Sequence, residues 1–344
     1  MNDNILVLAH KACLDGAAAA WCFWRRFPNA EIHFVQYGDP VPVDVTDRVV
    51  VVADFCFDLE TTKELIKKAR AYTMLDHHPL AEKVVDGIRA WVTSVDFDIE
   101  ASFHDVKGVE SSVDCGAVDG YWGHLFVQYN KNESGAMQAW KFCFPDQEPA
   151  DFIKYHDDYD RWKFKIPETD PYMAGMGRYP LNLVTFKTIF NGAFDGPLPT
   201  LNSQSSDVVA LGKPLVEYRN ALVGNIIKDT KHYLKVRDHN GMVHTVPVAN
   251  GPKQLISYIS HALSYGDKDA PFSLVYYDTN KGRVYRFGSR EEDGMNVTPV
   301  AEFWGGGGHA NASGTVHNKR QNLFTPWQGF KQRAKRFLKL DMRK

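Results

Sequence analysis

The first third of the chain alternates apolar runs with segments of helical character. Four apolar or alternating runs have the length of strands, and they cover residues 4–9, 31–37, 48–53 and 71–75. Residues 15–26 are alanine-rich and of helical length, and residues 58–70 are amphipathic, with acids early and bases late as the helix dipole favours. This order of elements predicts a parallel α/β sheet.

The later part of the chain predicts a second, smaller α/β domain. Residues 182–204 are dense in Gly, Pro, Asn and Ser, and residues 207–228 follow with the character of a long helix. Beyond them, strands are expected at residues 233–236, 243–248, 272–277 and 283–288, and a helix at 252–265.

These patterns divide the chain. The expected parts are a first domain at residues 1–185, a connector and linker helix at 186–230, a second domain at 231–322 and a basic C-terminal helix at 323–344. Residues 83–132 are irregular and rich in Asp, Ser and Gly, so we interpret them as an insertion or a lid within the first domain.

Three of the predicted strands end in residues that bind metals. His10 follows the first strand, Asp54 the third, and Asp76 with His77 the fourth. Because the carboxyl ends of parallel strands meet at one edge of a sheet, these side chains should converge. Asp15, at the start of the first helix, should face the same crevice. The strand ends therefore predict a metal site.

Another polar cluster lies at residues 155–162, where three carboxylates and a histidine stand among aromatic residues. The aromatic residues indicate partial burial, and buried carboxylates must be paired or bind metal. A carboxylate from this segment would complete the site; the alternative is a solvated helix end.

Four consecutive glycines, Gly305 to Gly308, precede His309 near the end of the second domain. Glycine lets backbone N–H groups approach an anion closely. The run lacks the Lys-Ser/Thr of a nucleoside-triphosphate P-loop and the spacing of a dinucleotide-binding fingerprint. It favours a phosphate or nucleotide cradle, with His309 and Arg290 as charged partners, over a flexible turn.

Composition narrows the class of protein. The 344 residues are 44% hydrophobic and 24% charged, and the net charge of −2 gives no reason to expect tight binding to long duplex nucleic acid. Five cysteines without CxxC spacing argue against a disulfide framework or a zinc knuckle. The N-terminus has no signal-peptide pattern, and no apolar run reaches the roughly 18 residues of a membrane span. We therefore expect a cytoplasmic protein.

The ordered motifs resemble those of the DHH/DHHA1 phosphoesterase superfamily across nearly the whole chain. Four motifs match in the first domain, at residues 10–16, 52–54, 76–78 and 156–158. The DHHA1 signature matches residues 306–314. The superfamily includes RecJ-type exonucleases, nanoRNases and phosphodiesterases of linear or cyclic dinucleotides. The fold that the resemblance implies is a parallel-sheet DHH domain and a smaller α/β DHHA1 domain, joined by a linker helix.

The resemblance also implies a site with two divalent metal ions, Mn²⁺ in the first place and Mg²⁺ as the alternative. The implied metal ligands are His10, Asp15, Asp54, Asp76, His77 and Asp158, with Asp54 shared by both ions. Asp76 would bind or orient a ligand, and His78 would face the scissile phosphate, so these two are the implied catalytic residues. The implied substrate-binding residues are Arg290, Gly306, Gly307, Gly308, His309 and Asn311.

Cys13 departs from the pattern of the superfamily, which often has an aspartate at that position. This leaves the first metal with one carboxylate fewer. Cys13 would be either a thiolate ligand or, as we favour from the sequence, a neutral packing thiol.

The resemblance implies a hydrolase that cleaves short single-stranded oligonucleotides or dinucleotides to mononucleotides. Two alternatives remain at this stage: a RecJ-like single-strand exonuclease and a catalytically silent nucleotide-binding protein. No membrane partner is expected, and a homodimer is compatible with the resemblance.

Overall fold

A six-stranded sheet forms the centre of the first of two units. The boundary between the units along the chain falls within helix α8 (Leu198–Thr230). The computed structural model describes residues 4–94, 101–105, 125–190, 198–280 and 282–317. The units comprise Met1–Val216 and Glu217–Lys344, and each is treated by itself. The expected C-terminal helix at 323–344 lies outside the described residues.

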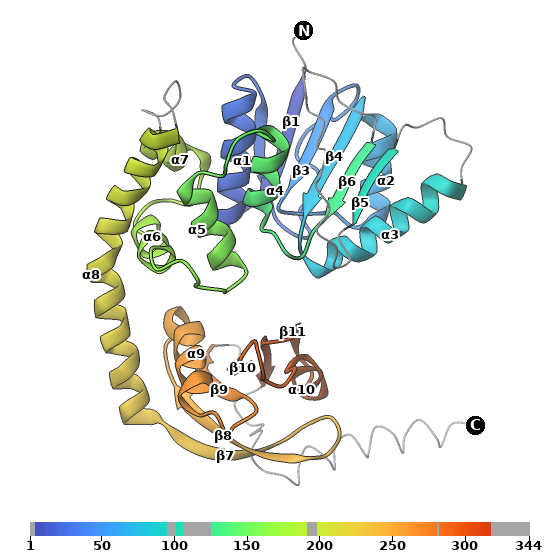
Figure 1. The fold of residues 1–344 in the computed structure, drawn as a ribbon. Coiled ribbons are helices and arrows are strands. Elements are labelled where there is room, and N and C mark those ends of the chain that lie inside the picture. The colour runs from blue at the N-terminus through green and yellow to red at the C-terminus, as the bar shows by residue number, and fades with distance from the viewer. Residues whose placement is uncertain (1–3, 95–100, 106–124, 191–197, 281, 318–344) are drawn as a thin grey trace, which may run out of the picture. The chain divides into compact units, whose positions relative to one another are not determined.

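All strands of the first sheet run parallel, as the sequence predicts (Figure 1). Their order is β2-β1-β3-β4-β6-β5. The strands are β1 (Ile5–His10), β2 (Glu31–Val35), β3 (Val49–Ala53), β4 (Ala71–Asp76), β5 (Ala101–Asp105) and β6 (Leu125–Tyr129). The segment interpreted as an insertion or lid, residues 83–132, contains most of α3 (Pro79–Ser94) and strands β5 and β6, which extend the sheet. The remainder of that segment, residues 95–100 and 106–124, lies outside the described residues.

Helices cover both faces of this sheet, because successive strand residues point to opposite sides. Figure 1 shows α1 and α4 on one face of the sheet and α2 and α3 on the other. Val7 and Val51 belong to the core on the first face, and Leu6 and Val52 belong to the core on the second. The helices of the unit are α1 (Leu14–Arg26), α2 (Leu59–Lys68), α3 (Pro79–Ser94), α4 (Gly135–Cys143), α5 (Asp151–Asp160), α6 (Thr169–Met176), α7 (Leu183–Phe190) and the first part of α8 (Leu198–Thr230).

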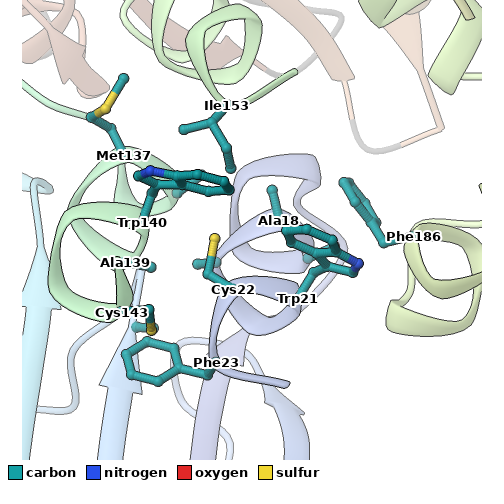
Figure 2. Close-up of a cluster of buried hydrophobic side chains, with 14 of the residues drawn as sticks. Ala18, Trp21, Cys22, Phe23, Met137, Ala139, Trp140, Cys143, Ile153 and Phe186 are labelled. Carbon is teal, nitrogen blue, oxygen red and sulfur yellow. The ribbon is translucent and has the colours of Figure 1, made fainter. Parts of the chain in front are cut away.

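An aromatic cluster joins α1, α4, α5 and α7 (Figure 2). The ring of Trp21 lies 5.1 Å from that of Phe152 in an edge-on arrangement, and Trp140 and Phe186 also pack against Phe152. Truncation of a buried aromatic of this size costs about 3–5 kcal/mol. The cluster fixes α1 and α5 relative to each other, and both helices carry acidic residues to the edge of the sheet.

The second unit contains a mixed sheet with the order β11-β12-β10-β9-β8-β7. Strands β8 and β9 pair in parallel, and the other neighbours pair antiparallel. Its elements are the end of α8, β7 (His232–Arg237), β8 (Val243–Asn250), η2 (Lys253–Leu255), α9 (Ile256–Gly266), β9 (Ser273–Thr279), β10 (Gly282–Gly288), α10 (Thr298–Phe303), β11 (Gly307–His309) and β12 (Ala312–His317). The expected α/β class is confirmed. Among the described helices, none has the length and hydropathy required to cross a membrane.

Candidate metal centre

The register of the parallel strands brings three predicted residues to one edge of the sheet. Ala9 pairs with Ala53, and Ala53 pairs with Leu75. The residues that follow these three are His10, Asp54 and Asp76, respectively, and they lie side by side at the carboxyl ends of β1, β3 and β4. The sequence prediction that these side chains converge agrees with this placement.

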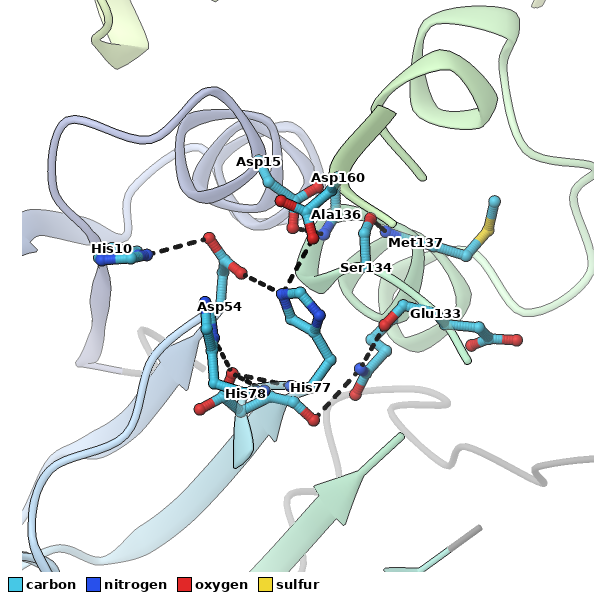
Figure 3. Close-up of polar contacts among 12 residues, drawn as sticks. His10, Asp15, Asp54, His77, His78, Glu133, Ser134, Ala136, Met137 and Asp160 are labelled. Atoms are coloured by element: carbon cyan, nitrogen blue, oxygen red, sulfur yellow. Dashed lines mark hydrogen bonds and ion pairs between the residues drawn. The ribbon is translucent and has the colours of Figure 1, made fainter. Parts of the chain in front are cut away.

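Asp54 lies at the centre of the group and contacts two imidazoles (Figure 3). Its Oδ1 is 3.1 Å from Nε2 of His77, and its Oδ2 is 3.5 Å from Nδ1 of His10. Nε2 of His77 is also 3.3 Å from Oδ2 of Asp160. Asp15 joins from α1, where its Oδ2 accepts a hydrogen bond from the backbone N–H of Ala136.

The backbone around Asp54 is shaped for this position. Asp54 has φ +57°, a left-handed conformation that is uncommon outside glycine and that proteins often retain at functional sites. Helix α4 begins directly against it, since a Cβ on Gly135 would lie 2.4 Å from Cβ of Asp54. Only glycine therefore fits at the start of α4 without moving the carboxylate.

The structure does not bring Asp158 to this cluster. Both of its oxygens accept hydrogen bonds from the segment that follows α5: Oδ1 from the backbone of Lys165, and Oδ2 from the backbone of Ile166 and the hydroxyl of Thr169. Asp158 thus closes a loop, and Asp160 supplies the carboxylate that faces His77. This corrects the assignment of Asp158 as a metal ligand.

The geometry of a helix indicates why Asp158 and Asp160 point to different sides of α5. Residues three apart share a helix face, whereas residues two apart do not. Asp157 and Asp160 therefore lie on one side of α5. Oδ1 of Asp157 accepts a hydrogen bond from the backbone N–H of Ser134, the N-cap of α4, which ties this face to the site.

The donor atoms of the cluster fit a cation. Among the described residues, four buried atoms in it have no hydrogen-bond partner: Nδ1 of His10, Oδ1 of Asp15, Oδ2 of Asp54 and Oδ2 of Asp76. Burying such atoms unpaired is costly. Oxygen and imidazole nitrogen atoms are ligands that Mn²⁺, Mg²⁺ and Zn²⁺ accept.

The pKa values of Asp15 and His77 are both raised, which indicates that a positive charge would stabilise the cluster. Burial raises the pKa of Asp15 well above its usual range, and the charge of Asp54 adds to this effect. Burial lowers the pKa of His77, but the hydrogen bond with Asp54 and the charge of Asp160 outweigh it and raise the pKa to about 10. A proton on His77 or a divalent cation can supply the positive charge.

Asp76 and His78 form a pair beside the cluster. Oδ1 of Asp76 accepts hydrogen bonds from the backbone N–H groups of His77 and His78 and from Nδ1 of His78, the last at 2.7 Å. Asp76 therefore fixes the orientation of the His78 ring and leaves Nε2 for another partner.

In the part of the chain that the structure describes, three overlapping groups of side chains could hold a metal ion, because the ligand atoms of each group lie within 4.8 Å of one another. Asp54 takes part in two of the groups. The groups are His10, Cys13 and Asp54; Asp15, His77 and Asp160; and Asp54, Asp76, His77 and His78.

In the second unit, Arg290 has a structural role that the sequence did not indicate. It is buried, and its guanidinium donates hydrogen bonds to the carbonyl oxygens of Ser264, Asp267, Lys268 and Ala270 and to the carboxylate of Asp293. These acceptors engage Nε and both Nη atoms. This corrects the assignment of Arg290 as a phosphate-binding residue.

The glycine run also differs from the expected cradle. The N–H groups of Gly305 and Gly306 donate to carbonyl oxygens of α10, and Gly307–His309 forms edge strand β11. A Cβ on Gly306 would lie 2.0 Å from the carbonyl oxygen of Gly314, so glycine is required for strand packing. Gly308 has φ +143°.

The other two predicted residues of this region differ in exposure. The side-chain nitrogen of Asn311 donates to Oγ of Ser289 and to the carbonyl oxygen of Arg290, which joins the ends of β10 and β12. His309 is exposed on β11.

Comparisons with known proteins extend this description. No protein-family model matches the chain. Uncharacterized protein R106 of Acanthamoeba polyphaga mimivirus is 22% identical over 329 residues, which are 90% of this chain and 66% of that protein. The chain thus spans just under two thirds of the length of this relative.

Two solved structures are similar along most of this chain. A pGpG-specific phosphodiesterase, PggH of Vibrio cholerae, is 13% identical, with 97% of each chain covered and a TM-score of 0.50. RecJ of Thermus thermophilus, solved in complex with Mg²⁺, is 12% identical, with 97% of this chain and 49% of RecJ covered and a TM-score of 0.40. The first likeness extends to the fold, whereas the second score is too low to carry an argument.

The fold agrees with the motifs read from the sequence, which lie at the ends of β1, β3 and β4. The chain therefore shares its fold with the pGpG-specific phosphodiesterase of Vibrio cholerae.

Proposed function

We propose that this protein is a metal-dependent phosphodiesterase that hydrolyses short oligonucleotides or dinucleotides, linear or cyclic, to mononucleotides. One observation carries the proposal: buried carboxylates and imidazoles with unpartnered atoms surround Asp54 at the carboxyl edge of a parallel sheet. Divalent cations held there would activate water and neutralise charge on a phosphodiester.

The ligands fall into two proposed sets. His10 and Asp54 belong to the first set, and Asp15, His77 and Asp160 to the second. Asp54, whose Oδ1 lies 3.1 Å from Nε2 of His77, is proposed to serve both sets. The oxygen and nitrogen donors of the second set suit Mn²⁺ or Mg²⁺. Each residue lies at a strand end or on a helix packed against the sheet, so the donors are held by rigid elements.

Two further side chains are proposed to contact the substrate near the metals. His78 is oriented by Asp76, and its Nε2 is proposed to meet a phosphoryl oxygen. Tyr37 is 39% exposed, and its ring lies 5.4 Å from that of His10 and 6.1 Å from that of His78. Its free face is proposed to stack on a base or sugar of the substrate.

A short substrate is favoured over a long strand. PggH of Vibrio cholerae, which is similar in fold, is a pGpG-specific phosphodiesterase, and this supports a linear dinucleotide as the first substrate to test. The net charge of −2 is also unlike that of proteins that hold long nucleic acid through many phosphates.

The test compares two substrates. Purified protein is incubated with Mn²⁺ and either a 5′-labelled dinucleotide or a labelled single-stranded 30-mer. The proposal predicts turnover of the dinucleotide to mononucleotides and little cleavage of the 30-mer. Rapid degradation of the 30-mer would indicate a RecJ-like exonuclease, and binding without turnover of either substrate would indicate a silent nucleotide-binding protein.

A further inference from the structure

Cys13 lies inside the proposed first metal site. Its Sγ, a ring nitrogen of His10 and a carboxylate oxygen of Asp54 are within 4.8 Å of one another. The side chain is partly exposed, whereas Cys22, Cys56 and Cys143 are buried in the cores. Among the cysteines that the structure describes, Cys13 is thus the one whose sulfur lies close to both an imidazole and a carboxylate that could share a metal ion with it.

The local backbone directs Cys13 to this place. The chain turns sharply after β1, where Ala12 has φ +57°, and Cys13 is the N-cap residue of α1. Gly16 allows the helix to begin close to the strand end, since a Cβ there would lie 2.4 Å from the carbonyl oxygen of His10. Burial, together with the charges of Asp54 and Asp15, raises the pKa of the Cys13 thiol well above its usual range, so a thiolate there requires a cation beside it.

The partners of Cys13 point independently to a ligand. Asp54 is fully buried, and its Oδ2 has no hydrogen-bond partner. Nδ1 of His10, 3.5 Å from that oxygen, is also buried without a hydrogen bond. His10, Cys13 and Asp54 thus place a nitrogen, a sulfur and an oxygen atom close enough together to bind one metal ion.

This donor set differs from that of the second proposed site. Thiolate sulfur is a soft ligand that favours zinc over manganese or magnesium. Catalytic zinc sites have three protein ligands, drawn from histidine, cysteine and carboxylate side chains, and one open position. Asp15, His77 and Asp160 offer only oxygen and nitrogen atoms.

We propose that His10, Cys13 and Asp54 form a zinc site in which Cys13 binds as a thiolate, next to a second site that takes Mn²⁺ or Mg²⁺. The inference rests on the proposed function, because it concerns the same metal centre. Binding would release the thiol proton to solvent, and the cation would balance the charges of the thiolate and the carboxylate. Small side-chain rotations would bring the three donor atoms to bonding distance.

Cobalt substitution tests the sulfur ligand without an activity assay. Metal-free protein is loaded with Co²⁺, bound cobalt is quantified, and the sulfur-to-cobalt charge-transfer absorption is recorded in the near ultraviolet. The expected result is a charge-transfer band in the wild type and in Cys143→Ala, a buried control on α4, and no band in Cys13→Ser. Bound cobalt without such a band in the wild type, or a band that persists in Cys13→Ser, would overturn the proposal.

A second variant tests the choice of metal. Cys13→Asp replaces sulfur with oxygen, so it should lower the preference for Zn²⁺ over Mn²⁺ in equilibrium dialysis by about tenfold or more. An unchanged preference would contradict the role of Cys13. Failure of the proposed function gives a different result from failure of this inference. If the cluster around Asp54 binds no metal, neither the wild type nor any variant retains cobalt.

Discussion

At the residue scale, Asp158 and Asp160 illustrate how two carboxylates on one helix acquire separate roles. Asp158 accepts hydrogen bonds from the segment after α5, and Asp160 faces the imidazole of His77. The first stabilises the fold of the unit, and the second adds negative charge to the proposed metal centre. Their substitution by asparagine, which keeps the shape of the side chain, should therefore have opposite consequences.

We predict that Asp160→Asn lowers turnover by about a hundredfold or more, because it removes a proposed metal ligand. Its free energy of unfolding without metal should not fall, because the substitution removes one of several negative charges that repel one another at the site. Asp158→Asn should instead lose about 1–3 kcal/mol of stability while the folded protein keeps its activity. Denaturant unfolding and steady-state kinetics of both variants measure these effects. The reverse pattern would restore Asp158 as the ligand.

At the scale of elements, the start of α4 supports the end of β3. Gly135 contacts Asp54 directly, and Ser134 caps the helix with its hydroxyl on the backbone N–H of Met137. The helix N-terminus also faces Asp15, whose carboxylate accepts from Ala136. One helix end therefore positions two proposed ligands, and a small change there should reach the metals.

Gly135→Ala is predicted to lower metal affinity by about tenfold, because the added Cβ displaces Asp54. Gly224→Ala, in α8, is the matched control, since a Cβ there meets no atom within 4 Å. The control should stabilise the helix by up to about 1 kcal/mol and leave metal binding unchanged. Isothermal titration with Mn²⁺ measures the affinity. Equal affinity in both variants would show that the contact has no influence.

The elements also show which parts of the site could be predicted from the sequence. His10, Asp54 and Asp76 follow apolar runs, and parallel pairing places such ends together whatever the details of packing. Asp160 could not be chosen in this way, because the choice depends on where α5 ends and which face it presents. Arg290 was misread because the carbonyl oxygens that it contacts, those of Ser264 and Ala270, come from distant positions in the chain. The glycine run was misread because its N–H groups bond to α10 and its residues pair with β12, two elements that flank it closely in the sequence.

At the scale of the whole molecule, a buried histidine couples stability to pH. His156 is fully buried in the core of the first unit against Phe152, Tyr172 and Phe186, and its Nδ1 has no hydrogen-bond partner among the described residues. Burial lowers its pKa to about 3, from an ordinary value of 6.5. The folded protein therefore keeps this side chain neutral where the unfolded chain binds a proton.

The sign of the effect follows from this difference. Above pH 6.5 His156 is neutral in both states, so it contributes no pH dependence. As the pH falls from 6.5 towards 3, the unfolded state alone gains the proton, and stability declines by up to about 1.4 kcal/mol per pH unit. We predict that His156→Phe removes this component. Denaturant unfolding of both proteins at a series of pH values measures it, and parallel curves would contradict the assignment.

The central claim for the molecule is that Asp54 organises a metal centre that hydrolyses phosphodiesters. The most direct measurement follows cleavage of a 5′-labelled dinucleotide by chelator-treated wild type and Asp54→Asn before and after divalent metal is restored. The account predicts that metal restores mononucleotide production in the wild type, and that Asp54→Asn stays folded but inactive at every metal concentration. Full activity of Asp54→Asn, or wild-type cleavage that survives complete metal removal, would contradict it.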